Sequence, residues 1–222
     1  MGKNGYTFEK KSPVRRWTEQ VMRRPPGLSK REMKQSGIDG RPVYVRATQN
    51  EYPRLHQAVE EVAALFQIDV PAAYIQTDNR VLAMADPAKE SIWLAEDIYD
   101  ALSDSELKAV VAHEMKHIYH PLVIRSSAKK QLEFDADQAA VAATDPQTVI
   151  NVLHKIERVM VRRIPDKQER DELDATMDAN PDGELVYNDE LAHFLQRYLH
   201  PTKAERITAV LASGRDFGGT TR

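Results

Sequence analysis

The stretch His113-Glu114-Met115-Lys116-His117 sets two histidines four residues apart, with a carboxylate beside the first. On a helix, positions i and i+4 lie on one face, so both imidazole rings can reach one metal ion. Glu114 lies one residue further round, where its carboxylate can hold a water molecule at that metal. The pattern predicts a zinc hydrolase, but a bare motif also arises by chance, so the flanking sequence has to support it.

The residues before the motif predict that it lies on a helix. Ser103 and Glu106 have the spacing of a capping box, in which each side chain bonds the backbone N–H of the other residue. Spacings of three and four residues then mark a buried helical stripe: Leu107, Val110, Val111, Glu114 and Ile118. We therefore expect a helix that starts near Ser103 and carries the histidines beside the hydrophobic core.

A second acidic pair follows in the segment 132–140, where Glu133 and Asp137 stand one helical turn apart. Two histidines and a glutamate form a recognised catalytic zinc set that leaves a fourth position for water. Glu133 is thus the predicted third ligand, after His113 and His117. Asp137 is predicted to accept the free ring N–H of a ligand histidine, with His113 preferred. The alternative is that both acids belong to a solvated helix face.

Taken in order, these motifs resemble the HtpX-type and CAAX-prenyl-protease zinc metallopeptidases of the gluzincin clan. The resemblance runs from about residue 54 to 210 and takes in "LSDSELKAVVAHEMKHIYH", "LEFDADQAA" and "HPTKAERI". It implies an α+β, zincin-like (gluzincin) fold, in which a small twisted sheet packs on the metal helix and the C-terminal half is mostly helical. It also implies a zinc metalloendopeptidase that acts on a peptide or protein substrate.

Two features separate the chain from many members of the resembled family. Only fifteen residues lie between His117 and Glu133, where many members carry a longer and sometimes membrane-crossing insertion. The chain also has Leu82-Ala83-Met84-Ala85 where the family often shows an Asn-Ala-Phe-Ala-like segment. The resemblance is therefore to the short, soluble end of the family.

The resemblance places a His-Pro pair and an arginine near the zinc, and the matching residues are His200 and Arg206. His200 precedes a predicted capping box of the last helix, whose positive end suits a developing oxyanion. Arg206 is expected either to stabilise the tetrahedral intermediate or to pair with Glu133 or Asp137. Instead, His200 could fill the fourth zinc position in a latent enzyme. For both residues the alternative is a purely structural role.

Four short strands are predicted ahead of the metal helix: 42–46, 72–76, 81–85 and 91–95. A helix is expected between the first two strands, over residues 52–67. The resemblance implies that one strand is a sheet edge along which an extended peptide lies. Ser91–Leu94 is the candidate, and the alternative is a buried strand with Trp93 in the core.

Helices are also predicted after the zinc ligands. One is expected over residues 145–163, another from Asn188, and a last one that stops at Gly214. The polar, acid-rich stretch 166–187 is predicted to be either a lid or a solvated connection.

Composition narrows the possible classes of protein. The 222 residues include no cysteine, which excludes disulfides, thiolate zinc sites and thiol nucleophiles. No apolar run approaches a membrane span and the first forty residues lack a signal-peptide core, so we expect a soluble, cytoplasmic protein. The chain divides into a basic N-terminal arm (1–40), a zinc metallopeptidase domain (41–213) and a C-terminal tail (214–222).

Charge is spread unevenly along the chain. Residues 1–53 carry twelve Lys or Arg against five acidic residues, and the remainder carry nineteen against twenty-nine. The net charge of -3 thus combines a basic arm with an acidic body. The arm could contact nucleic acid, an anionic surface or an acidic partner, but we favour packing across its own acidic body.

The predicted mechanism uses zinc to lower the pKa of a bound water and Glu114 to carry its proton to the leaving amine. The main alternative is a catalytically silent, zinc-stabilised adaptor or regulatory module whose basic arm binds a partner. Glu114 argues against it, because a structural site needs no general base. Non-haem iron also uses two histidines and a carboxylate, but its usual setting is a β-barrel.

Overall fold

The structure is a computed structural model, and it describes residues 44–77, 82–119, 126–164, 166–183 and 201–216. The basic N-terminal arm, His200 and the helix expected from Asn188 lie outside these residues.

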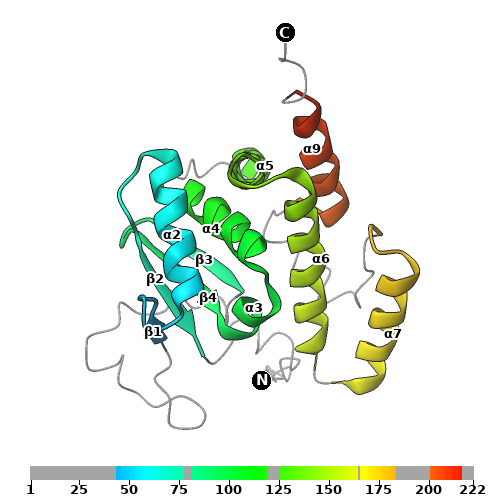
Figure 1. The fold of residues 1–222 in the computed structure, drawn as a ribbon. Coiled ribbons are helices and arrows are strands. Elements are labelled where there is room, and N and C mark those ends of the chain that lie inside the picture. Colours follow the sequence, from blue (N-terminus) through cyan, green and yellow to red (C-terminus); the bar gives the residue numbers. More distant parts are fainter. Residues whose placement is uncertain (1–43, 78–81, 120–125, 165, 184–200, 217–222) are drawn as a thin grey trace, which may run out of the picture.

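A four-stranded sheet of order β1-β2-β4-β3 forms one side of the molecule (Figure 1). The strands are β1 (Tyr44–Arg46), β2 (Ala72–Gln76), β3 (Ala83–Asp86) and β4 (Ser91–Ala95). Strands β2 and β4 run parallel, whereas β1 pairs with β2 and β3 pairs with β4 in antiparallel fashion. Among the strands that the structure describes, β1 and β3 therefore form the edges of the sheet.

The prediction that Ser91–Leu94 forms a sheet edge is wrong. Strand β4 is hydrogen-bonded on both sides and all of its residues are buried. Trp93 stacks on Tyr74 of β2, with ring centroids 4.5 Å apart, and donates its indole N–H to Ser91 Oγ. The alternative, a buried strand with Trp93 in the core, is the one observed.

Two helices, α2 (Pro53–Phe66) and α4 (Asp104–Tyr119), pack against each other and against the sheet (Figure 1). The short helix α3 (Glu96–Ala101), which the sequence did not indicate, links β4 to α4. The side chains that fill this layer are fully buried: Leu55, Val59 and Val62 of α2, Ile75, Ile92 and Leu94 of the sheet, and Leu107, Val111 and Met115 of α4.

The predicted capping box at the start of α4 is confirmed. The Ser103 N–H donates to Glu106 Oε2 at 2.6 Å, and the Glu106 N–H donates to Ser103 Oγ at 3.4 Å. Every member of the predicted buried stripe of α4 is buried. The rotation of α4 about its axis is thus fixed, which determines where its remaining side chains point.

The C-terminal half of the described chain is helical. It comprises α5 (Ser126–Ala143), α6 (Pro146–Arg162), α7 (Lys167–Ala179) and α9 (Lys203–Asp216). Asp145 caps α6 as predicted, since its carboxylate accepts the Thr148 N–H at 2.9 Å. Helix α9 continues through Gly214 to Asp216, two residues beyond its predicted end.

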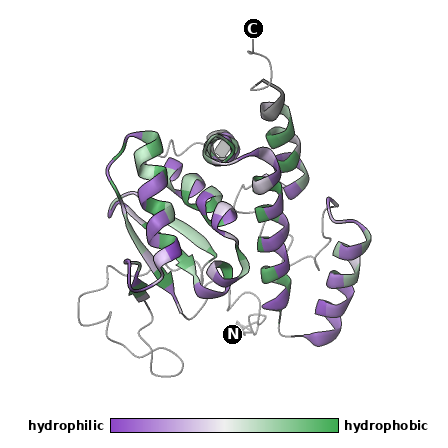
Figure 2. Cartoon of the chain, viewed as in Figure 1, coloured by the Kyte–Doolittle hydropathy of each residue, from purple (hydrophilic) through white to green (hydrophobic). Residues whose placement is uncertain are grey.

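Helix α7 occupies most of the stretch expected to be a lid or a solvated connection. It lies on the outer side of α6 (Figure 1) and is hydrophilic along most of its length (Figure 2). Only Leu173 and Met177 are buried. Two apolar positions in thirteen residues are too few for the helical period to stand out in the sequence.

The described residues form a mixed α+β fold with a small sheet and a predominance of helix, which confirms the predicted class at that level. Within these residues, none of the helices combines the length and the apolar character that crossing a membrane requires.

The packing of α4 predicts a difference between two leucines. Leu107 is 0% exposed and Leu65 of α2 is 50% exposed. Leu107→Ala should lower the free energy of unfolding by about 2–5 kcal/mol because it opens a cavity in the core. Leu65→Ala should change it by about 0.5 kcal/mol or less. Urea unfolding of the two variants measures the difference, and similar losses would show that this core is wrongly assigned.

Candidate metal centre

His113 and His117 lie one turn apart on the side of α4 that faces α5, and both side chains are mostly buried. Their Nε2 atoms point toward each other and are 3.1 Å apart, with the two rings nearly perpendicular. The i, i+4 spacing therefore does what the sequence predicts, because it directs two imidazole nitrogens at one point.

Glu133 reaches the same point from α5, which packs against α4 (Figure 1). Its Oε2 lies 3.5 Å from His113 Nε2, and its Oε1 lies 3.5 Å from His117 Nε2. Ala136, one turn later on α5, is fully buried, and this small residue allows the two helices to approach closely. In the part of the chain that the structure describes, these three residues are the one group with metal-ligand geometry.

The spacing of these donors fits a zinc ion. Two atoms bound at about 2.0–2.1 Å in a tetrahedral arrangement lie about 3.4 Å apart. The two imidazole Nε2 atoms are 3.1 Å apart and each lies 3.5 Å from a different Glu133 oxygen, so both separations are close to that value. Two imidazoles and a carboxylate also match the donor set of catalytic zinc sites, and the chain has no thiolate to compete with them.

Asp137 is buried behind His113, and the predicted contact between them is present. Asp137 Oδ1 lies 3.0 Å from His113 Nδ1, and the carboxylate is 2% exposed. A carboxylate at this position keeps a proton on Nδ1 and leaves the Nε2 lone pair directed at the metal position.

Arg206 of α9 holds the other side of the same carboxylate. Its Nε donates to Asp137 Oδ2 at 2.8 Å, and its Nη2 donates to Oδ1 at 2.5 Å. Of the two roles expected for Arg206, pairing with Asp137 is the one that this geometry shows. Hydrogen bonds thus link His113 of α4 to Asp137 of α5 and Asp137 to Arg206 of α9.

These contacts change the protonation of the metal-free site. Burial favours the neutral His113 ring, but the hydrogen bonds to Asp137 and Glu133 outweigh burial and raise the pKa of His113 to about 9. Burial would raise the pKa of Asp137, yet the charge and hydrogen bonds of Arg206 and the bond to His113 hold that pKa below its usual value. The His113 ring therefore carries a second proton, and a positive charge, at neutral pH in the metal-free protein.

Glu114 is buried on the same helix as the two histidines, one position round from His113. Together with Asp137 and Glu133, its negative charge raises the pKa of Arg206, against the effect of burial. The carboxylate is thus near enough to the site to act electrostatically on it.

Strand β3 brings a sheet edge beside α4, which packs on β3 and β4. The Ala95 N–H donates to Leu82 O at 2.9 Å, and in an antiparallel pair the hydrogen-bonded positions alternate. In this register the backbone groups of Met84 and Asp86 bond β4, whereas the N–H and C=O groups of Ala83 and Ala85 point outward, away from β4. The sequence did not identify this edge. Residues 82–85 are, however, the segment that differs from the Asn-Ala-Phe-Ala-like segment of the resembled family.

The site predicts how metal binding depends on pH. A zinc ion bound here would have to displace the His113 proton, so zinc affinity should rise with pH until pH approaches the pKa of about 9. Calorimetry at pH 7 in buffers of different ionisation enthalpy should show about one proton released per zinc. Asp137→Asn lowers the His113 pKa and should release clearly less. Equal proton release by both proteins would contradict the assignment.

Comparison with known proteins identifies a family and several relatives. Residues 49–213 match the model of peptidase family M48. A protease HtpX homolog of Trichormus variabilis is 34% identical over 74 residues, 32% of this chain and 26% of that protein. The homolog of Thermoanaerobacter pseudethanolicus is 35% identical over 77 residues, 33% and 26% of the two chains.

A third relative, the protease HtpX homolog of Methanocaldococcus jannaschii, is 33% identical over 82 residues, 36% of this chain and 29% of that protein. The matched region thus spans well under a third of these relatives' own lengths. No solved structure matches the chain significantly. The family model covers most of the chain and contains every described residue of the site, so the chain belongs to peptidase family M48.

Proposed function

We propose that the chain is a zinc-dependent endopeptidase that hydrolyses peptide bonds with Glu114 as the general base. Membership of family M48 supports a metal-dependent peptidase with peptide or protein substrates. The observation that carries the finer proposal is the convergence of His113, His117 and Glu133 on one point, with ligand atoms within 4.8 Å of one another.

Zinc would be held by His113, His117 and Glu133, and when bound it would supply a Lewis acid for water activation and for polarising the peptide carbonyl. The remaining steps belong to the protein's own residues. Glu114 takes a proton from the attacking water and delivers it to the leaving amine. Asp137 and Arg206 hold the His113 ring in one orientation and one tautomer throughout.

The outer edge of β3 offers a place for the substrate. An extended peptide can pair with the outward N–H and C=O groups of Ala83 and Ala85, as in other complexes formed by strand addition. Because α4 packs on β3, a peptide bound in this way lies beside the helix that carries Glu114. Backbone pairing of this kind depends little on the substrate's side chains.

The silent-adaptor alternative is less well supported, because the chain keeps Glu114 next to a complete set of donors. The catalytic or latency role of His200, a contact of the basic arm with nucleic acid or an anionic surface, and a cytoplasmic location all stay predictions.

Glu114→Gln tests the proposed reaction directly. The variant should fold and bind zinc like the wild type, because it retains all three donors. Cleavage of an unfolded protein such as casein should fall at least about a hundredfold, because the amide cannot accept the water's proton. Metal content by mass spectrometry and the initial rate of cleavage measure the two properties.

Two further variants separate loss of the base from loss of the metal. Glu133→Ala should lose both zinc and cleavage, whereas Asp135→Ala, on the same helix turn, should keep both. If wild type and Glu114→Gln cleaved equally well, the chain would not use this mechanism and the adaptor function would gain support.

Proline substitutions test the substrate position. Ala85→Pro removes an N–H that points away from β4, so the variant should fold, keep zinc and raise the KM for peptides by about threefold to tenfold. Met84→Pro, one residue earlier, removes an N–H that the ladder uses, and should instead lower the thermal stability. An unchanged KM in Ala85→Pro would place the substrate elsewhere.

A further inference from the structure

The first turn of α9 has to be held in place for Arg206 to meet Asp137. Its capping box is confirmed, since the Thr202 N–H donates to Glu205 Oε2 at 2.8 Å and the Glu205 N–H donates to Thr202 Oγ1 at 3.1 Å. A capping box fixes where a helix starts, but not how the helix sits on its neighbours. That position depends on contacts between α9 and the rest of the protein.

Lys203, the first residue of α9, makes two such contacts. Its Nζ lies 2.5 Å from Glu157 Oε2 of α6 and donates to Pro181 O at 2.7 Å. The Lys203 and Glu157 side chains are only 9% and 13% exposed. An ion pair removed from water tolerates little misplacement, because separating the two charges leaves each of them poorly compensated.

The Pro181 carbonyl is itself held by the tight turn Asn180–Gly183. The Gly183 N–H donates to Asn180 O at 3.0 Å, and a Cβ on Gly183 would come within 2.2 Å of Asn180 Nδ2. Asp182 of the same turn pairs with His154 of α6 at 3.1 Å. Lys203 therefore ties the first turn of α9 to both α6 and the turn that follows α7.

Lys203 and Arg206 are three residues apart, so their side chains leave neighbouring parts of the helix surface within one turn. We propose that Lys203 is a positioning residue for the metal site: it fixes the first turn of α9 and thereby sets Arg206 against Asp137 and Asp137 against His113. The inference rests on the proposed function, because it takes His113 to be a zinc ligand.

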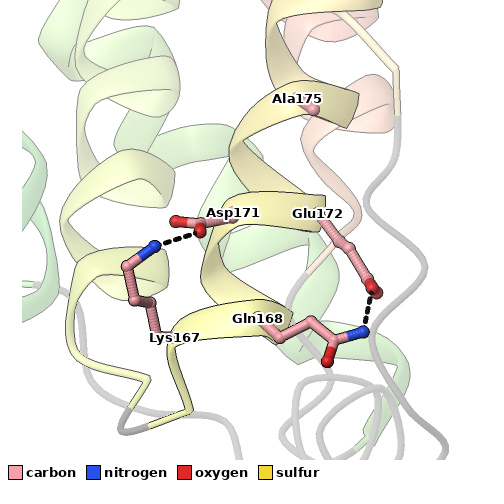
Figure 3. A pocket seen from close by; sticks show the side chains of 5 residues that line it. All are labelled: Lys167, Gln168, Asp171, Glu172 and Ala175. Atoms are coloured by element: carbon pink, nitrogen blue, oxygen red, sulfur yellow. Dashed lines mark hydrogen bonds and ion pairs between the residues drawn. The ribbon is translucent and has the colours of Figure 1, made fainter.

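Two other sets of contacts between described residues do not fix the first turn of α9 in this way. Lys130 of α5 also pairs with the first turn of α9, through Glu205 at 3.0 Å, but the two side chains are 46% and 45% exposed. Exposed ion pairs of this kind contribute little to the stability of the fold. Figure 3 shows a surface hollow on α7, where Lys167 bonds Asp171 and Gln168 bonds Glu172 within the helix itself. Those pairs connect α7 to no other element.

The test measures zinc affinity by competition with a chelating dye, in the full chain, for Lys203→Met and for the matched control Lys130→Met. Lys203→Met should weaken zinc binding about threefold to tenfold, less than the loss expected for a direct partner of a ligand. It should also shift the visible spectrum of the Co2+-loaded protein, which reports ligand geometry. Lys130→Met should change affinity less than about twofold.

The same substitution in an Arg206→Met background separates positioning from general stability. If Lys203 acts through Arg206, Lys203→Met should have no further effect on zinc affinity there, while its effect on thermal stability remains. If Lys203→Met does not fold, the joint variant Lys203→Met/Glu157→Leu takes its place in the wild-type and Arg206→Met backgrounds. The joint variant leaves no unpaired buried charge.

Four outcomes would each overturn a claim. Unchanged zinc affinity in Lys203→Met, or an equal loss with and without Arg206, overturns the positioning role while the proposed function stands. Failure of the joint variant to fold as well would show that Lys203 and Glu157 serve folding, and also overturns it. A wild-type protein that binds no zinc overturns the proposed function and the inference together.

Discussion

A buried carboxylate, Asp137, lies between a histidine and an arginine, and the geometry of the site depends on it. Removing such a charge from water costs several kcal/mol unless hydrogen bonds and an opposite charge compensate. Here the His113 ring and the Arg206 guanidinium supply that compensation. Because each partner comes from a different helix, α4, α5 and α9 have to be correctly packed before the carboxylate can be buried at all.

This constraint connects the fold to the chemistry. The buried stripe of α4 fixes the rotation of that helix about its axis, so the two histidines beside the stripe are held facing α5. Small residues on α5, such as Ala136, bring Glu133 within reach. The site is therefore assembled by ordinary packing, and a metal ion would find one donor atom from each residue already within 4.8 Å of the others.

Sequence reasoning worked where the information is local. The capping boxes at Ser103 and Thr202 and the histidine spacing each lie within one or two helical turns, and the structure places them as predicted. Strand order depends on pairing between residues that are far apart in the sequence. Because β3 and β4 are both short and mostly apolar, the sequence could not show which of the two is the edge. The Lys203–Glu157 pair, separated by 46 residues, carries no sequence signal either.

The shortness of β3 has a consequence for affinity. Its outer edge presents two residues, Ala83 and Ala85, and so offers at most four backbone groups to a peptide. At about 1 kcal/mol for each hydrogen bond, pairing alone supplies about 4 kcal/mol, which corresponds to a dissociation constant near 1 mM. A peptide held only in this way would leave quickly. If the proposed substrate position is right, such an edge would favour substrates that are abundant or long and unfolded, which can rebind along their length, over any particular sequence.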